Sequence, residues 1–211
     1  MANRILKDYK NVSLNIDDIQ GCLDFGDIFG RKAPIHIEIG SGKGTFLVNQ
    51  ARHHPEISYL GIEWARKYYR AAVDRLGRWS IPNVRMTRTD AATFIAEKLS
   101  DASVDCFHIY FPDPWPKKRH HKRRFFSETN VLQLLRCLKP DGVIQFATDH
   151  EGYFEQAEEV LATQSISEKT QKIEFTQAAD AQDKEVVGTN YERKYIKIGK
   201  PIYTTAVSKN P

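Results

Sequence analysis

Residues 35–44 read Ile-His-Ile-Glu-Ile-Gly-Ser-Gly-Lys-Gly, and the rest of the chain repeats the pattern that they begin. The first five residues form a short apolar, β-branched run of the kind found in strands. Three glycines at alternate positions follow, and glycine enters tight turns because it adopts left-handed backbone angles without steric cost. Residues 45–53 have a helical pattern that Pro55 stops. This order of strand, glycine turn and helix is the unit from which α/β sheets are built.

The alternation of strand and helix continues to residue 163. We predict further strands at 58–63, 84–89, 104–111 and 143–148, and helices at 65–79, 91–99, 125–138 and 152–163. Beyond them we expect strands at 173–175 and 202–207, a polar loop at 178–184, and a short helix that Thr189 and Glu192 open as a capping box. The sequence therefore predicts an open parallel sheet with helices on both faces.

The first 33 residues carry only weak signals. We expect an N-terminal extension over residues 1–33 and one α/β domain over residues 34–211, since 211 residues suit a single domain.

Composition narrows the class of protein. Apolar residues make up 41% and charged residues 27%, which is ordinary for a soluble globular chain. The first residues lack the apolar run of a secretory signal, and no window approaches the ~18 apolar residues of a membrane span. The three cysteines have neither metal-like nor redox-like spacing, so we expect free thiols and a cytoplasmic protein.

The glycine turn carries an acid on its strand side. Glu38 precedes Gly40, Gly42 and Gly44, whereas a dinucleotide-binding turn would need Gly or Ala at Thr45. The Gly-Lys-Ser/Thr ending of a phosphate-binding P-loop is missing too. A carboxylate beside the turn repels a pyrophosphate but suits a cation. S-adenosylmethionine, which carries a sulfonium and an ammonium, fits this pattern.

Two more acids end the next predicted strands. Glu63 lies where a carboxylate can accept both hydroxyls of a ribose, and Asp90 with Ala91 lies where an adenine edge could be held. The alternative for each acid is helix N-capping, because each precedes a helical segment. Three acids at successive strand ends favour a nucleoside site.

A second motif, residues 111–124, reads Phe-Pro-Asp-Pro-Trp-Pro-Lys-Lys-Arg-His-His-Lys-Arg-Arg. The chain holds 31 basic and 27 acidic residues, and six of the basic ones lie here, which leaves 25 elsewhere. The net charge of +4 is therefore local. A basic run of this kind docks nucleic acid or an anionic membrane, or is a solvated loop or localisation signal. As RNA-binding residues we predict Lys118, Arg119, His120, His121, Lys122, Arg123 and Arg124.

Asp113 stands between Pro112 and Pro114, whose rings restrict the backbone and stiffen the loop. A fixed carboxylate can accept the N1–H and N2–H donors of guanine. Trp115 could stack on a base or pack beneath the loop.

With these motifs in hand, residues 35–207 resemble the bacterial tRNA (guanine-N7-)-methyltransferases. The most specific likeness is the Pro-Asp-Pro-Trp-Pro turn with its basic run at residues 112–124. Residues 38–44 and 61–63 are similar to the cofactor motifs of that family, and residues 148–149 and 189–192 to two later motifs.

The resemblance implies a Rossmann-like class I methyltransferase fold with a mostly parallel seven-stranded sheet. It implies methylation of guanine N7 in tRNA, at the variable-loop guanine (m7G46), with S-adenosyl-L-methionine as donor and no required general base. Asp113 would be catalytic and lie beside the cofactor together with Glu38, Glu63 and Asp90. Substrate contacts would come from Lys117, Asp149, Thr189, Asn190, Tyr191 and Glu192. We expect tRNA as partner, no metal and no membrane, and a monomer or homodimer.

Three other classes compete with this interpretation. An amino-methyltransferase acting on adenine N6 or cytosine N4 uses an Asp/Asn-Pro-Pro-aromatic turn, whereas here the aromatic residue, Trp115, stands one place early. A non-catalytic RNA-binding protein would not need the cofactor acids. A dehydrogenase is disfavoured by Thr45 and by the lack of a hydride-handling site.

Overall fold

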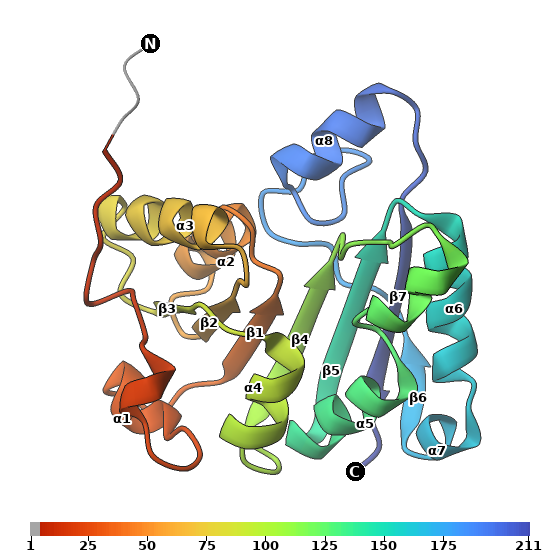
Figure 1. Ribbon diagram of the computed structural model, residues 1–211, viewed down its shortest axis with the longest axis horizontal. Coiled ribbons are helices and arrows are strands. Elements are labelled where there is room, and N and C mark those ends of the chain that lie inside the picture. The colour runs from red at the N-terminus through yellow and green to blue at the C-terminus, as the bar shows by residue number, and fades with distance from the viewer. Residues whose placement is uncertain (1–4) are drawn as a thin grey trace.

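A computed structural model describes residues 5–211, except the side chain of Asn190 (Figure 1). Its centre is a seven-stranded sheet in the order β3-β2-β1-β4-β5-β7-β6. The pairs from β3 to β5 are parallel, and β7 runs antiparallel to both β5 and β6. The expected mostly parallel sheet with helices on both faces is confirmed.

The strands follow the predicted order along the chain. They are β1 (Ile35–Ile39), β2 (Ser58–Ile62), β3 (Val84–Thr87), β4 (Val104–Tyr110), β5 (Leu138–Thr148), β6 (Thr170–Ile173) and β7 (Tyr203–Lys209). The helices are α1 (Phe25–Phe29), α2 (Thr45–His53), α3 (Arg66–Arg78), α4 (Ala91–Lys98), α5 (Glu128–Cys137), α6 (Glu151–Leu161), α7 (Gln164–Ser167) and α8 (Asn190–Lys197), with 3₁₀ turns η1 (Ile16–Asp18) and η2 (Lys118–Arg123). None of the described helices is long and apolar enough to cross a membrane.

Successive side chains of a strand point to opposite faces, so the sheet has two cores. On one face, Phe107 and Phe146 pack with residues of α4, α5 and α6 such as Phe94, Leu134 and Tyr153. On the other face, Tyr59, Met86 and Tyr110 pack with residues of α2 and α3, such as Phe46 and Leu76. The same alternation determines on which face of the sheet each polar side chain of β1 and β4 lies.

The N-terminal segment packs on the main core. Val12 is fully buried, and Ser13 forms a β-bridge with Met86 at the free edge of β3. The ring of Tyr9 lies against Gly77 of α3. Val12 and Leu23 of this segment thus belong to the hydrophobic core of the sheet, and the boundary placed at residues 33 and 34 stays a prediction.

Several predicted bounds were wrong. The strand predicted at residues 143–148 begins earlier, at Leu138, because the pairing of β5 with β4 shifts register after Val104, where Asp141 adopts a left-handed φ of 61°. The helix predicted from residue 125 begins at Glu128, because the Ser127 side chain accepts the N–H of Asn130 as an N-cap. The strand predicted at 173–175 is β6, which ends at Ile173.

Because Tyr9 contacts Gly77, we expect the effect of Gly77→Ala on stability to change sign when Tyr9 is replaced. A Cβ at Gly77 would lie 2.1 Å from Cγ of Tyr9, so Gly77→Ala should destabilise the chain by about 1–3 kcal/mol. In a Tyr9→Ala background the same change should stabilise by up to about 1 kcal/mol, because alanine favours helix and the clash is gone. Urea unfolding of the four chains measures both effects. Equal effects in the two backgrounds would show that Tyr9 does not pack there.

Candidate functional site

The predicted cofactor and substrate residues meet at the carboxyl edge of the sheet. Glu38 lies one residue before the end of β1, Glu63 and Asp149 directly follow β2 and β5, and Asp113 lies in the loop after β4. Helix α8 lies above the ends of β4 and β5 in Figure 1. Ligands of open α/β sheets bind at this edge, so the topology gathers the acids where a ligand would bind.

The glycine turn after β1 has the backbone that its sequence requires. Gly40, Gly42 and Gly44 have φ values of 80°, 54° and 68°, all in the left-handed region. A Cβ at Gly40 or Gly42 would meet no atom within 4 Å, whereas one at Gly44 would press on Ala72 of α3 at 3.1 Å. Gly44 therefore serves helix packing, and Gly40 and Gly42 leave open space for a ligand.

Glu38 is buried, with 5% of its surface exposed, and its Oε2 has no hydrogen-bond partner among the described residues. Burial, aided by the charge of Glu63, raises the pKa of the Glu38 carboxyl to about 8 although Ser41 opposes the shift. A buried carboxyl with an unpartnered oxygen is costly unless something pairs with it. The pairing group that this site lacks is a donor or a cation.

Glu63 braces the turn from the neighbouring strand. Its Oε2 accepts the N–H of Gly42 at 2.8 Å, and its Oε1 accepts the N–H of Ala65 at 2.7 Å. Burial raises the pKa of Glu63, while these two hydrogen bonds lower it. Each oxygen keeps a further lone pair, so the carboxylate can still accept from ribose hydroxyls.

Asp90 is exposed and caps α4, since its side chain accepts the N–H of Thr93 at 2.9 Å. The alternative of N-capping is therefore what the structure shows for this acid. Ala91 begins the same helix and is half-buried. Capping fixes the backbone at Asp90 and Ala91 without closing off the remaining lone pairs of the carboxylate.

The loop of Asp113 is built in a strained form. Phe111 and Trp115 have φ values of 50° and 44°, in the left-handed region that residues other than glycine seldom adopt. The N–H of Phe111 donates to the carbonyl of Ala147 at 2.7 Å, which holds the start of the loop on β5. Asp113 itself is exposed. Strain of this kind concentrates at functional sites.

Arg124 anchors this loop from inside the protein. Only 3% of its surface is exposed, and its guanidinium donates to the carbonyls of Pro114 and Gly152 and to Gln156 Oε1, each at 2.8 Å. It also lies 4.8 Å from the ring centre of Tyr153. The hydrogen bonds of this side chain are made inside the protein, so the structure gives Arg124 a structural role, and its RNA contact stays a prediction.

The rest of the basic run faces outward. Lys118, Arg119, Lys122 and Arg123 are exposed on η2, Lys117 is exposed just before it, and His120 and His121 are half-buried. No carboxylate of the described residues forms an ion pair with these cations. Trp115 packs against this turn, 4.9 Å from Arg123 and edge-on to His120 at 5.9 Å. Trp115 therefore supports the shape of the basic surface.

Asp149 and helix α8 form the opposite wall. Asp149 pairs with Lys200, whose ammonium also lies 4.5 Å from the ring centre of Tyr195. Tyr191 is 45% exposed and contacts Phe111 and Tyr195, with ring centres 5.2 Å and 4.7 Å away. The sequence analysis missed Lys200 and Tyr195. Lys200 follows a glycine after the Tyr-Glu motif of residues 191–192, and nothing in that pattern predicts that its side chain lies at the end of β5.

Two residues predicted to touch substrate have structural roles. Thr189 caps α8 by accepting the N–H of Glu192 at 3.2 Å. Glu192 is fully buried and accepts the N–H groups of Val186, Val187 and Gly188. Its carboxylate is occupied by the preceding loop, which gives Glu192 a structural role, and its substrate contact stays a prediction. The predicted contact of Asn190 lies outside the described side chains.

The loop before α8 is held by its own hydrogen bonds. Glu185 accepts from Arg193 at 2.7 Å and 3.0 Å, and Gln50 of α2 donates to the carbonyl of Ala179 at 3.2 Å. Val187 is fully buried. These contacts fix α8 over the sheet edge without a ligand.

The amino-acid sequence of this chain resembles those of known proteins over most of its length. Residues 32–205 match a protein family described as "Putative methyltransferase". A relative from Rhodopirellula baltica named tRNA (guanine-N(7)-)-methyltransferase is 37% identical, over 92% of this chain and 72% of its own. Proteins of the same name are 35% identical in Lactococcus lactis, over 90% and 85% of the two chains, and 40% identical in Thermotoga maritima, over 89% and 58%. The chain thus spans little more than half of the Thermotoga relative.

Solved structures resemble the fold. The 16S rRNA methyltransferase KamB superposes with a TM-score of 0.63 over 91% of this chain and 96% of its own, at 13% identity. A Streptococcus mutans structure described as a putative methyltransferase in complex with SAH gives 0.53 over 84% and 89%, at 11% identity. At such identities the likeness shows a shared fold.

The raised pKa of Glu38 predicts a pH dependence of stability. The folded chain keeps this proton between pH 4.5 and about 8 while the unfolded chain loses it, so stability is full below pH 4.5 and falls as pH rises to about 8. Glu38→Gln should therefore stabilise the ligand-free protein at pH 8 more than at pH 5, by a few kcal/mol at most. Urea unfolding at both pH values, with the exposed Glu97→Gln as control, measures the difference. An equal change at the two pH values would contradict the buried, protonated carboxyl.

Arg124 and its neighbour Arg123 form a matched pair. Arg124→Ala should cost about 2–4 kcal/mol of stability, because three carbonyl-type acceptors lose a buried donor. Arg123→Ala removes an exposed cation and should change stability by less than about 0.5 kcal/mol. Thermal and urea unfolding give both values. Similar small losses would mean that Arg124 does not anchor the loop.

Proposed function

The chain belongs to the tRNA (guanine-N7-)-methyltransferase family, and we propose that it methylates guanine N7 in tRNA with S-adenosyl-L-methionine as methyl donor. Family membership supports the reaction. The observation that carries it to this site is the buried Glu38 oxygen without a partner, beside a glycine turn with open space, at the sheet edge that also holds Asp113. We assign the activity to the cytoplasm, where tRNA is modified.

S-Adenosyl-L-methionine supplies, when bound, an electrophilic methyl group on a sulfonium. Glu38 suits its cationic portion, because a cation both pairs with the buried oxygen and lowers the pKa of the carboxyl. Gly40 and Gly42 let the backbone approach it, and Glu63 offers its remaining lone pairs to the ribose. The capped start of α4, at Asp90 and Ala91, is the proposed adenine contact.

Asp113 is the proposed catalytic residue, and its task is positioning. Guanine N7 carries a lone pair and no proton, so its attack on a methyl group needs no general base. The carboxylate of Asp113 can accept the N1–H and N2–H groups of guanine and hold N7 in line with the methyl donor. Holding two reactants in this way is by itself a large source of rate. Arg124 holds the loop in place for that purpose, including the strained backbone at Phe111 and Trp115.

The tRNA contacts follow from charge and exposure. Lys117, just before η2, and Lys118, Arg119, Lys122 and Arg123 on it are exposed and form no ion pair with a carboxylate of residues 5–211, which suits the phosphates of an RNA backbone. Tyr191 and Asp149 face the same edge from α8 and β5, so they are proposed to contact the target nucleoside. As the target we propose the variable-loop guanine, m7G46.

A methyl-transfer assay on unmodified tRNA, followed by digestion and mass spectrometry, tests the proposal. The wild type should yield 7-methylguanosine, and Asp113→Ala should lower the rate by about 10²-fold or more because the base is no longer held. Asp113→Asn keeps one acceptor and should lose less. Methyladenine, no product, or full activity in Asp113→Ala would overturn it.

Salt dependence tests the basic surface. If about four phosphates are neutralised, log K for tRNA against log salt should have a slope near −3 to −4. Neutralising Lys122 and Arg123 together should reduce the slope by about 2, since each phosphate contact contributes about 1. The exposed Lys43→Ala, on the glycine turn, is a control for net charge. An unchanged slope in the double variant would place the RNA elsewhere.

A further inference from the structure

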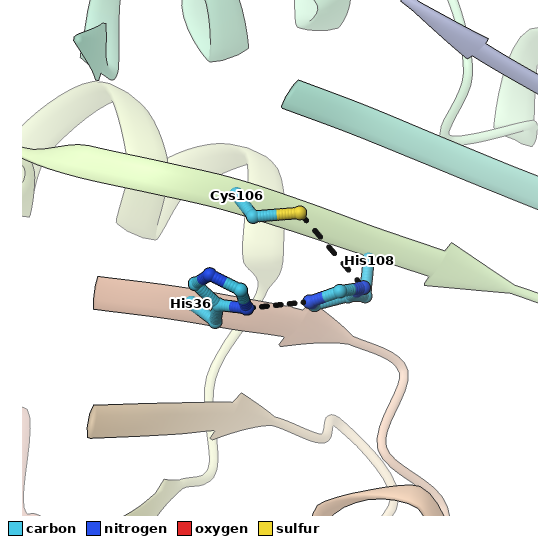
Figure 2. A group of neighbouring side chains, drawn as sticks. All are labelled: His36, Cys106 and His108. Carbon is cyan, nitrogen blue, oxygen red and sulfur yellow. Dashed lines mark hydrogen bonds between the residues drawn. The ribbon is translucent and has the colours of Figure 1, made fainter. Parts of the chain in front are cut away.

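Two imidazoles and a thiol lie close together on the sheet face that α2 and α3 cover. Figure 2 shows His36 of β1 and Cys106 and His108 of β4 pointing toward one another. The parallel register sets His36 opposite Cys106, and His108 lies two residues further along β4. Side chains two apart in a strand share a face, so all three enter the same interior.

The donor atoms lie close enough to share one ion. The two nitrogens that would share the ion, Nδ1 of His36 and Nε2 of His108, are 3.1 Å apart, and Sγ of Cys106 approaches the same ring of His108, 4.0 Å from its other nitrogen, Nδ1. One ligand atom from each residue can be chosen so that all three lie within 4.8 Å of one another. Tetrahedral zinc bonds of about 2.0–2.1 Å to nitrogen and 2.3 Å to sulfur give edges near 3.3 Å and 3.6 Å. The nitrogen edge already fits, and the thiol needs a movement of about 1 Å.

The surroundings favour neutral ligands. Cys106 and His108 are buried, and His36 is partly exposed. Phe46 and Tyr59 form apolar walls, with ring centres 4.8 Å from His108 and 5.4 Å from His36 respectively. Metal sites of this composition hold Zn²⁺ or similar thiophilic ions.

A second contact orients one ligand. Nδ1 of His108 lies 2.8 Å from the hydroxyl of Tyr110, which turns Nε2 toward His36. Histidines that bind metals commonly use the other ring nitrogen in such a hydrogen bond. Without an ion, the side chains of Tyr110, His108 and His36 can form a chain of hydrogen bonds in the same positions. The cluster therefore folds without an ion.

We propose that His36, Cys106 and His108 bind one Zn²⁺ ion that joins β1 to β4. The Sγ–H bond of Cys106 breaks and its proton leaves to solvent as the Zn–S bond forms, while the two imidazoles donate lone pairs. A fourth position stays open to water on the side of His36, which is partly exposed whereas the other two are buried. The site departs from the expectation of no metal, since residues 70 apart in sequence give no spacing signal.

Cobalt(II) titration of the metal-free full chain tests the site, because Co²⁺ reports tetrahedral geometry and thiolate ligation by absorption. We expect saturation at one equivalent with a thiolate charge-transfer band, displacement by Zn²⁺, and a rise in melting temperature with either ion. Cys106→Ala should abolish the charge-transfer band. His36→Gln, at a partly exposed position, should weaken binding at least tenfold while circular dichroism shows a folded chain.

Two cysteines outside the cluster are matched controls. Cys137 is buried and Cys22 is exposed, and both lie away from the three ligands. Cys137→Ala and Cys22→Ser should bind Co²⁺ as the wild type does. The proposal is overturned by no band, by binding only in large excess (an adventitious ion only), by a band that survives Cys106→Ala, or by one lost with Cys22→Ser. These readouts do not depend on methyl transfer.

Discussion

A buried carboxyl group, one of whose oxygens has no hydrogen-bond partner among the described residues, is the constraint on which this site depends. Strand β1 carries Glu38 to the end of a buried parallel sheet, where water cannot solvate its charge. Burial raises the pKa of this carboxyl to about 8, so at neutral pH the group is mostly protonated in the free protein, and a cation bound beside it would favour the ionised form. The glycine turn and Glu63 complete the site, because they open space beside the carboxyl and fix the backbone around it.

The loop that holds Asp113 depends on a different constraint, which is the rigidity of its backbone. The loop of Asp113 is exposed and strained, and a strained loop persists only where its surroundings overdetermine it. Arg124 supplies that restraint from inside, and Glu192 does the same for the segment that leads into α8. Charged residues adjacent in sequence to functional ones therefore divide into two groups. Some face the ligand, and others hold the ligand-facing residues in place.

The sequence predicted the alternation of strands and helices well, because apolar runs and glycine turns are local signals. It also identified the acids at the strand ends. It did not reveal the structural roles of Arg124 and Glu192, since a charged residue in a motif looks the same whether it faces solvent or satisfies buried backbone groups. Lys200 and the His36–Cys106–His108 cluster were missed for another reason. Their contacts arise from the register of strands that are distant in sequence, and no spacing along the chain encodes that register.

The state of the Glu38 proton tests the central claim most directly. Calorimetric titration of S-adenosyl-L-methionine at pH 7, repeated in buffers of different ionisation enthalpy, counts the protons released on binding. A carboxyl whose pKa is about 8 in the free protein should lose its proton when the cation binds, so release should approach one proton in the wild type and fall to near zero in Glu38→Gln. Equal proton release by the two proteins, or none by either, would contradict the account.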